Sequence, residues 1–264
     1  MERLGGALRK MRIEPASPAR YFLRTDQKEL FLNDLVGFPL HLEFTGKIFC
    51  VVCGRKISKA YGQGFCFPCF RDSPENSPCI IHPEKCRGHL GEGRDPQWER
   101  ENHVQPHIVY FAWSSGWKVG ITRENQIPTR WLDQGATVAI SIARTPYRYL
   151  AGVMEVTLKA HIPDKTDWRR MIALQEPPQP PKPPLQPEVI LPEDLKTYLL
   201  PPTDPVRLEY PLHGMFSKIV AVDLMKNPVF EGILAGMKGQ YLVLTDGRVL
   251  NIRNHSGYEI ILKG

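Results

Sequence analysis

The sequence predicts an α+β protein made of several small modules rather than one large domain. Three observations predict this class. Two closely spaced cysteine pairs follow a β-rich beginning, a central region alternates strand and helix patterns, and a proline-rich segment precedes a run of short strands. The chain has 264 residues and 42% apolar content, which is enough to bury at least one full core.

The first two modules are expected at residues 1–49 and 50–106. Clusters such as residues 38–44 are typical of strands, so residues 1–49 are predicted to be a β-rich N-terminal segment. Residues 50–106 are polar, are punctuated by proline and glycine, and hold few large aliphatic side chains. Such a segment cannot easily fold on a hydrophobic core, and a metal ion is the natural substitute.

Residues 107–175 are expected to form a compact α+β domain. Residues 107–113 and 117–122 are predicted to be strands joined by a turn, and residues 138–143 a third strand. One helix is predicted over residues 123–135, with Pro128 in its first turn. A second helix is predicted over residues 147–160, where Leu150, Met154 and Leu158 share one face.

The last two modules are a linker and a β module. Residues 176–205 are proline-rich, so a semi-rigid linker in extended conformation is expected, with a docking peptide for an aromatic groove as the alternative. Residues 206–264 contain five short strand patterns, the first over residues 215–222, and the turn Asp246-Gly247 between two apolar runs predicts a hairpin. The even spacing of these strands predicts a small β-barrel.

The strongest motif is the pair of Cys-x-x-Cys knuckles formed by Cys50, Cys53, Cys66 and Cys69. Each knuckle projects two thiolates, and two knuckles complete a tetrahedron around zinc. Redox catalysis could explain one pair but not two pairs at this distance. Four thiolates leave no open position for a reactive water, so the sequence predicts a structural zinc site.

A second group of potential ligands follows the first. It contains Cys79, His82, Cys86, His89 and His103, with the Cys-x-x-His spacing occurring twice. A second metal could bind here, with the two cysteines as the ligands to expect first. The alternative is that the histidines are solvated loop residues and the cysteines are spare.

Charge and hydropathy limit the classes of function. The net charge of +6 is compatible with a polyanionic partner without requiring one. No run of about 18 apolar residues occurs, and the N-terminus lacks the apolar stretch of a signal peptide. We therefore expect a cytoplasmic protein with no membrane partner, and the sequence indicates no particular protein partner.

The segment 107–122 resembles the core hairpin of the GIY-YIG nuclease superfamily. Ile108-Val109-Tyr110 stands where that motif has Gly-Ile-Tyr, and Lys118-Val119-Gly120 stands where it has Tyr-Ile-Gly. Arg130 and Glu155 follow on predicted helices, in the order of the catalytic residues of the superfamily. The resemblance implies that residues 107–175 form a GIY-YIG-like domain.

The resemblance also implies roles for these residues. Tyr110 would help to activate water, Arg130 would neutralise the phosphate in the transition state, and Glu155 would hold a magnesium ion. Lys118 departs from the motif, since lysine lacks the donor and acceptor behaviour of a phenol but can bind phosphate as a point charge. The alternatives are a core tyrosine at 110, an Arg130–Asp133 ion pair, and a solvated Glu155.

Most of the chain also resembles an uncharacterised, mainly bacterial family described only as a domain of unknown function. The stretches that carry this resemblance are residues 118–123, 128–136, 164–169, 238–242 and 249–253. Gly93 and Val104 stand where relatives have cysteines, which leaves the second metal site open.

Further basic and aromatic residues could extend a surface that follows a phosphate backbone. Arg123 competes with Arg130 for the phosphate role, and Trp131 and Trp168 could be stacking platforms. Arg144, Arg148, Arg169 and Arg170 complete this set, with a solvated basic face as the alternative.

Three functions are compatible with these features. The sequence favours a zinc-containing protein that binds nucleic acid, with RNA slightly favoured over DNA by analogy with other zinc-knuckle and small-barrel proteins. A magnesium-dependent phosphodiesterase that uses Tyr110, Arg130 and Glu155 is the first alternative. A scaffold for protein interactions is the second.

Overall fold

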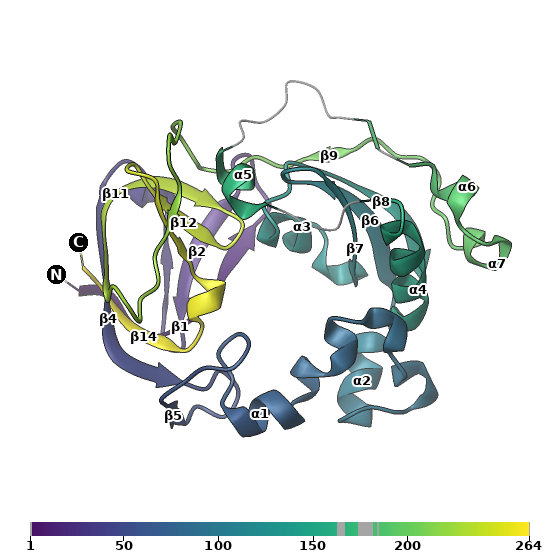
Figure 1. Cartoon of the computed structure of the whole chain (residues 1–264), viewed down its shortest axis with the longest axis horizontal. Helices are drawn as coiled ribbons and strands as arrows, with labels where there is room; N and C mark the ends of the chain where they lie inside the picture. The colour runs from purple at the N-terminus through teal and green to yellow at the C-terminus, as the bar shows by residue number, and fades with distance from the viewer. Residues whose placement is uncertain (1, 163–166, 174–181, 184, 264) are drawn as a thin grey trace. The chain divides into compact units, whose positions relative to one another are not determined.

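The computed structural model describes residues 2–162, 167–173, 182–183 and 185–263, and the chain divides into two compact units (Figure 1). The first unit combines Met1–Arg71 with Glu209–Gly264, and the second unit is Asp72–Leu208. The fold is mixed α+β, with large sheets and few helices. Within the described ranges, no helix is both long enough and apolar enough to span a membrane.

The first unit is built on a ten-stranded sheet in which the order is β10-β13-β12-β11-β4-β14-β1-β2-β3, with β5 paired to β4. The N-terminal strands are β1 (Glu2–Glu14), β2 (Arg20–Thr25), β3 (Glu29–Phe31), β4 (Pro39–Phe49) and β5 (Lys56–Ile57). The C-terminal strands are β10 (Val220–Ala221), β11 (Val229–Lys238), β12 (Tyr241–Leu244), β13 (Arg248–Asn251) and β14 (Tyr258–Lys263).

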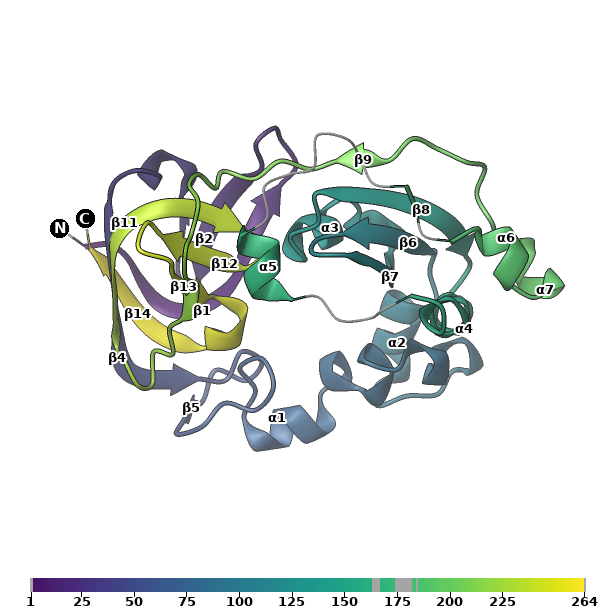
Figure 2. The same cartoon turned by 45° about the horizontal axis from the view of Figure 1, so that its top comes forward.

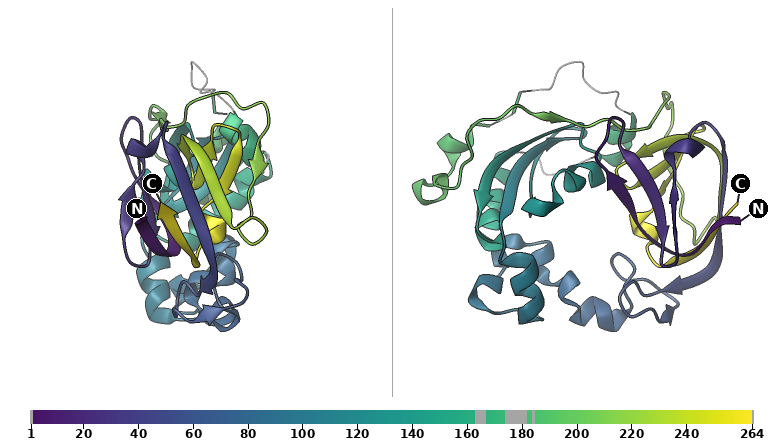
Figure 3. Two further views of the ribbon diagram at one scale, coloured as in Figure 1. Left: turned by 90° about the vertical axis from the view of Figure 1, so that its left-hand side faces the viewer. Right: turned by 180° about the vertical axis from the view of Figure 1, so that it is seen from behind.

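The C-terminal strands extend the N-terminal sheet instead of forming a module of their own. Strand β4 lies between β11 and β14, and β14 pairs with β1 on its other edge (Figure 3). The expected barrel over residues 206–264 is not closed, because the pairing path of the described strands ends at β10 and β3. Strands β11 and β14 both pair with β4, so their backbone N–H and C=O groups find partners without the strands closing into a barrel.

The strand positions themselves follow the sequence pattern. The hairpin expected at Asp246-Gly247 joins β12 to β13, and Gly247 adopts a φ of 83° while its N–H donates to the carbonyl of Leu244 at 3.0 Å. The first expected strand, residues 215–222, is reduced to the two residues of β10.

The second unit contains a four-stranded sheet of order β7-β6-β8-β9 (Figure 2). Its strands are β6 (His107–Trp113), β7 (Trp117–Arg123), β8 (Val138–Thr145) and β9 (Val206–Arg207). Its helices are α2 (Pro96–His103), α3 (Thr129–Asp133), α4 (Arg148–Lys159), α5 (Trp168–Ala173), α6 (Pro187–Ile190) and α7 (Glu193–Lys196). Helix α1 (Phe67–Asp72) ends where this unit begins.

The three predicted strands and the second predicted helix of the central region are present, but the first helix is shorter than expected. Residues 124–126 form a separate 3₁₀ turn, and α3 begins only after Pro128. Proline lacks the N–H group that a continuous helix would require at that point. Helix α4 buries Met154 and Leu158 in one core with Val109 and Phe111, as the helical spacing predicts.

The segment expected to be a linker is partly docked on the second unit. Residues 176–181 and 184 lie outside the described residues, as do Asp164, Lys165 and Thr166. Helices α6 and α7 interrupt the expected extended conformation, and Leu191 and Leu195 join the core beneath α4. The apolar side chains near these helices explain the docking, because they are buried against the sheet rather than left in water.

Helix α4 also supports a turn of the preceding polar segment. A Cβ atom added to Gly152 would lie 2.4 Å from the backbone N of Glu84 and 2.4 Å from the carbonyl carbon of Pro83. The turn therefore approaches the helix more closely than any side chain at position 152 would permit.

We expect Gly152→Ala to lower the free energy of unfolding of the second unit by about 1–3 kcal/mol, because the added methyl meets backbone atoms that cannot rotate away. Gly116→Ala is the matched control, since a Cβ there meets nothing within 4 Å and no positive φ is required. Thermal unfolding of the two variants is the measurement. Equal melting temperatures would contradict the close packing.

Candidate functional sites

The four predicted zinc ligands converge at the end of β4. Cys50 follows this strand directly, and Gly54 closes the first knuckle by donating its N–H to the Cys50 carbonyl at 3.0 Å. Cys66 begins the second knuckle, and its N–H donates to the Cys50 sulfur at 3.2 Å. As a result, the sulfurs of Cys53 and Cys66 lie 3.7 Å apart.

This spacing fits a tetrahedral metal ion. Zinc–sulfur bonds of about 2.3 Å place two sulfurs of one tetrahedron about 3.8 Å apart. The ligand atoms of Cys50, Cys53, Cys66 and Cys69 all lie within 4.8 Å of one another. The four-cysteine group could therefore hold a metal such as zinc.

The environment of these thiols promotes ionisation unevenly. Burial raises the pKa of Cys50, but backbone hydrogen bonds from Cys53 and Cys66 outweigh it and bring the value to about 6. Burial, together with hydrogen bonds to the other thiols, raises the pKa of Cys69 to about 12. Four thiolates cannot be formed together without a compensating cation, and a bound metal ion supplies that charge.

We expect Cys53→Ser to remove one equivalent of zinc from the purified protein and to lower its melting temperature, because three ligands hold the metal more weakly than four. Val52→Ser is the matched control, since Val52 is an exposed neighbour in the same knuckle. Elemental analysis of both variants is the measurement. Unchanged zinc content in Cys53→Ser would contradict the assignment.

A second group lies in the second unit and differs from the one expected. It consists of Cys79, Cys86, Glu99 and His103, all buried, with ligand atoms within 4.8 Å of one another. Cys79 lies in the 3₁₀ turn Pro78–Ile80, and Cys86 follows the turn Pro83–Lys85. Nδ1 of His103 lies 3.8 Å from the Cys79 sulfur and 3.5 Å from the Cys86 sulfur.

The expected ligands His82 and His89 do not join this group. His82 is exposed, and its Nδ1 lies 3.4 Å from the carboxylate of Glu84. His89 stacks on Tyr147, with ring centroids 4.7 Å apart. Each Cys-x-x-His pair is divided between separate short turns, so the two side chains of a pair do not face the same point.

Glu99 is the candidate ligand that the sequence analysis missed. It lies one turn before His103 on α2, whose N-terminus is capped by the Asp95 side chain. Residues four apart share a face of a helix, so Glu99 and His103 point the same way. Two features of the sequence could have indicated Glu99. It stands four residues before His103, and the helix that carries both begins at Asp95 and Pro96, in a segment that already holds two cysteines.

Tyr110 lies at the centre of a third group of residues. Its Cα pairs with that of Gly120 across the β6–β7 hairpin, and a Cβ at Gly120 would lie 2.7 Å from the tyrosine oxygen. The Tyr110 ring therefore occupies space that any side chain at position 120 would fill. The hydroxyl of Tyr110 donates to Oε1 of Gln134 at 3.1 Å.

Charged residues from two helices act on this tyrosine. Burial raises the pKa of Tyr110, and the nearby Arg130 lowers it through its charge and a hydrogen bond. The charge of Glu155 raises it again, so the phenol is neutral at physiological pH. Glu155 is only 7% exposed, and one of its carboxylate oxygens lies 3.3 Å from Nζ of Lys159.

Lys118 lies near this group on β7. Its Cα pairs with that of Ala112, two residues beyond Tyr110 on β6. Directly paired residues share a face of the sheet, and so do residues two apart, so Lys118 and Tyr110 belong to the same face.

Several of the other expected nucleic-acid contacts have partners within the second unit. Arg123 donates to Oδ1 of Asn102 at 2.6 Å, and Arg169 lies over the Trp168 ring at 4.4 Å. Trp131 is 3% exposed and packs edge-on against Tyr110, so its ring belongs to the core instead of a stacking platform.

Two further arginines have partners within the second unit. Arg144 donates to both carboxylate oxygens of Glu124, at 2.8 and 3.0 Å. Arg148 donates to the backbone carbonyls of Cys79 and Ile80, so it connects α4 to the turn that carries the second group.

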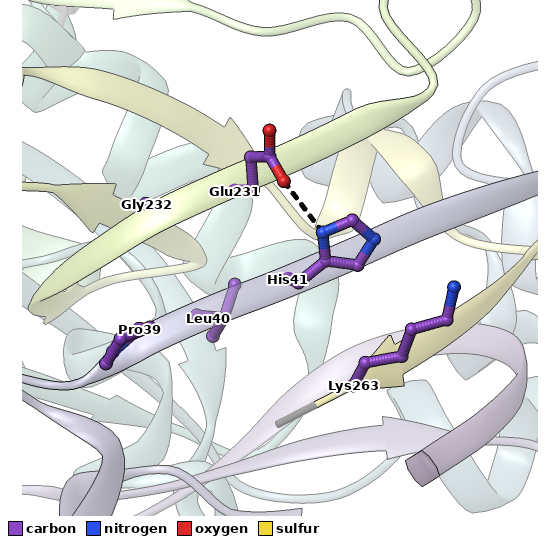
Figure 4. Close-up of a pocket in the computed structure, with 6 residues that line it drawn as sticks. All are labelled: Pro39, Leu40, His41, Glu231, Gly232 and Lys263. Carbon is purple, nitrogen blue, oxygen red and sulfur yellow. Dashed lines mark hydrogen bonds and ion pairs between the residues drawn. The ribbon is translucent and has the colours of Figure 1, made fainter. Parts of the chain in front are cut away.

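The first unit also has a shallow depression that the sequence did not indicate. It is lined by Pro39, Leu40, His41, Glu231, Gly232 and Lys263 (Figure 4). Nδ1 of His41 lies 2.8 Å from Oε2 of Glu231, and Lys263 donates to Glu43 at 2.7 Å. The ionisable side chains of the depression therefore already have partners, either one another or Glu43.

Comparison with known proteins shows the family of the chain. The family model described as protein of unknown function (DUF2797) matches residues 37–260, so the chain belongs to that family. No curated protein and no solved structure gives a significant match.

Proposed function

We propose that this member of the DUF2797 family is a zinc-containing protein that binds nucleic acid, with RNA slightly favoured over DNA. The phosphate backbone would be held by the second unit, around Tyr110, Arg130 and Lys118. The zinc would be held by the four-cysteine group and would stabilise the knuckles that follow β4.

The observation that carries this proposal is that the charges of Arg130 on α3 and Glu155 on α4 both act on Tyr110 of β6, and that Arg130 also hydrogen-bonds to it. Arg130 is half-buried and close to a phenol that donates hydrogen bonds. A half-buried planar guanidinium suits a phosphate group, because it can donate two hydrogen bonds to the phosphate oxygens while its charge offsets theirs.

Binding without cleavage is the better supported form of the proposal. The raised pKa of Tyr110 leaves almost no phenolate to act as a base at neutral pH, and the side chain has no exposed surface from which to reach a water molecule. Lys118 stands where the resembling nucleases have a second tyrosine. It can attract phosphate as a point charge, but it cannot replace a phenol that both donates and accepts.

A magnesium-dependent phosphodiesterase is the second candidate, and one observation favours it. Arg130 and Glu155 both act on Tyr110, and these are the residue types that the GIY-YIG resemblance assigns to catalysis. A glutamate oxygen suits magnesium, and a metal-bound water could act as the nucleophile in place of one activated by tyrosine.

We expect Arg130→Ala to weaken binding to a labelled single-stranded RNA by about 10- to 150-fold, since a charge-assisted contact to phosphate contributes about 1.5–3 kcal/mol. The slope of log affinity against log salt should fall by about 0.7. Arg144→Ala is the control, with a change of less than about twofold, because an exposed ion pair contributes little. Fluorescence anisotropy at several salt concentrations is the measurement. Equal losses in both variants would contradict a localised phosphate site.

We expect no cleavage when the purified protein is incubated with single- or double-stranded RNA or DNA in magnesium or manganese. The physical reason is the neutral, enclosed Tyr110 together with Lys118. Gel analysis of labelled substrates, with Glu155→Ala in parallel, is the measurement. Metal-dependent cleavage by the wild type that Glu155→Ala abolishes would instead establish the phosphodiesterase.

A further inference from the structure

The second group of ligand-type side chains is buried without adequate partners. Cys86 and Glu99 are each 2% exposed, and His103 is 3% exposed. Burying a carboxylate is costly unless a cation or several hydrogen bonds compensate its charge. Ser77 Oγ lies 3.4 Å from Oε1 of Glu99, while Oε2 lies against Nδ1 of His103 without the geometry of a normal hydrogen bond.

One imidazole nitrogen faces all three of the other ligand atoms. Nδ1 of His103 contacts the carboxylate of Glu99 and also lies near the sulfurs of Cys79 and Cys86. A single N–H cannot donate well to three acceptors at once. A cation at the shared centre would satisfy all four groups, with the nitrogen as a ligand rather than a donor.

The sulfur–nitrogen distances fit a zinc ion at that centre. Zinc–sulfur bonds of about 2.3 Å and zinc–nitrogen bonds of about 2.0–2.1 Å place sulfur and nitrogen about 3.6 Å apart in a tetrahedron. The two observed sulfur–nitrogen distances are 3.5 and 3.8 Å. Thiolates and imidazole favour zinc over magnesium or calcium, which prefer oxygen ligands.

We propose that Cys79, Cys86, Glu99 and His103 form a second zinc centre, independent of the four-cysteine site and of nucleic-acid binding. The four ligands are buried and their ligand atoms lie within 4.8 Å of one another, so together they would fill a tetrahedral coordination sphere and leave no position for a reactive water. It takes two sulfur ligands, one nitrogen ligand and one oxygen ligand.

The centre would fix the polar segment to the α+β sheet. Nε and Nη2 of Arg148 donate to the Cys79 carbonyl at 3.1 and 3.0 Å, and Gly152 admits the Pro83–Glu84 turn against α4. The metal thus connects α2 to a turn that α4 already holds. In a segment with few apolar side chains, this connection takes the place of a hydrophobic core.

Metal counting and zinc X-ray absorption of the full-length protein test the proposal. Wild-type protein should contain two zinc ions per chain with an average of about three sulfur ligands each. Cys53→Ser should keep one zinc, bound by about two sulfurs and two lighter atoms. Cys86→Ser should also keep one zinc, bound by about four sulfurs.

His82→Ala is the matched control for the second centre and should keep both metals, because His82 is exposed and outside the group. Glu99→Ala should lose the second zinc, or keep it with a water molecule in the position of the missing carboxylate. The spectrum of His82→Ala should show neither change. One zinc per chain with four sulfur ligands in the wild type would overturn the proposal. This outcome is measured on the wild-type protein, so it does not depend on whether any variant folds.

Discussion

The scarcity of apolar side chains between residues 51 and 103 constrains how the chain can fold there. Its buried aromatic or aliphatic side chains are Phe65 and Pro83, and the other buried groups include cysteines, serines, Glu99 and His103. So little apolar surface cannot offset the loss of conformational entropy of about fifty residues. Two groups of converging sulfur, nitrogen and oxygen ligands lie in this segment, one in each unit. Metal binding supplies the missing stabilisation in our proposal, and both groups have the spacing that it requires.

Long-range strand pairing stabilises the first unit in a different way. Strand β14, near the C-terminus, lies between β1 and β4, so residues more than 200 positions apart in the sequence are direct neighbours. The close approach of Gly257 to the Phe49 carbonyl, 2.1 Å from a hypothetical Cβ, continues this contact to the start of the first knuckle. The four-cysteine group is therefore supported by both ends of the chain, although its ligands are local in sequence.

The predictability of each feature depends on how local its cause is. The knuckle spacing of Cys50 to Cys69 and the helical face of Met154 and Leu158 are local, and the structure confirms that both sets converge. Strand patterns after residue 206 were also visible, but the partner of β14 depends on distant pairing that a pattern in one strand cannot reveal. Glu99 was missed because glutamate on a polar helix is usually solvated, and only the fold buries it beside two cysteines.

The enclosure of Tyr110 bears on what the second unit can do chemically. A general base must accept a proton, and both burial and the charge of Glu155 favour the protonated phenol. Arg130 opposes these effects, so a phosphate that drew Arg130 toward itself would leave the phenol more strongly protonated. Anion binding would then leave even less phenolate at neutral pH to accept a proton from water. This coupling, together with Lys118 on the same face of the sheet, favours a site that holds phosphate over one that hydrolyses it.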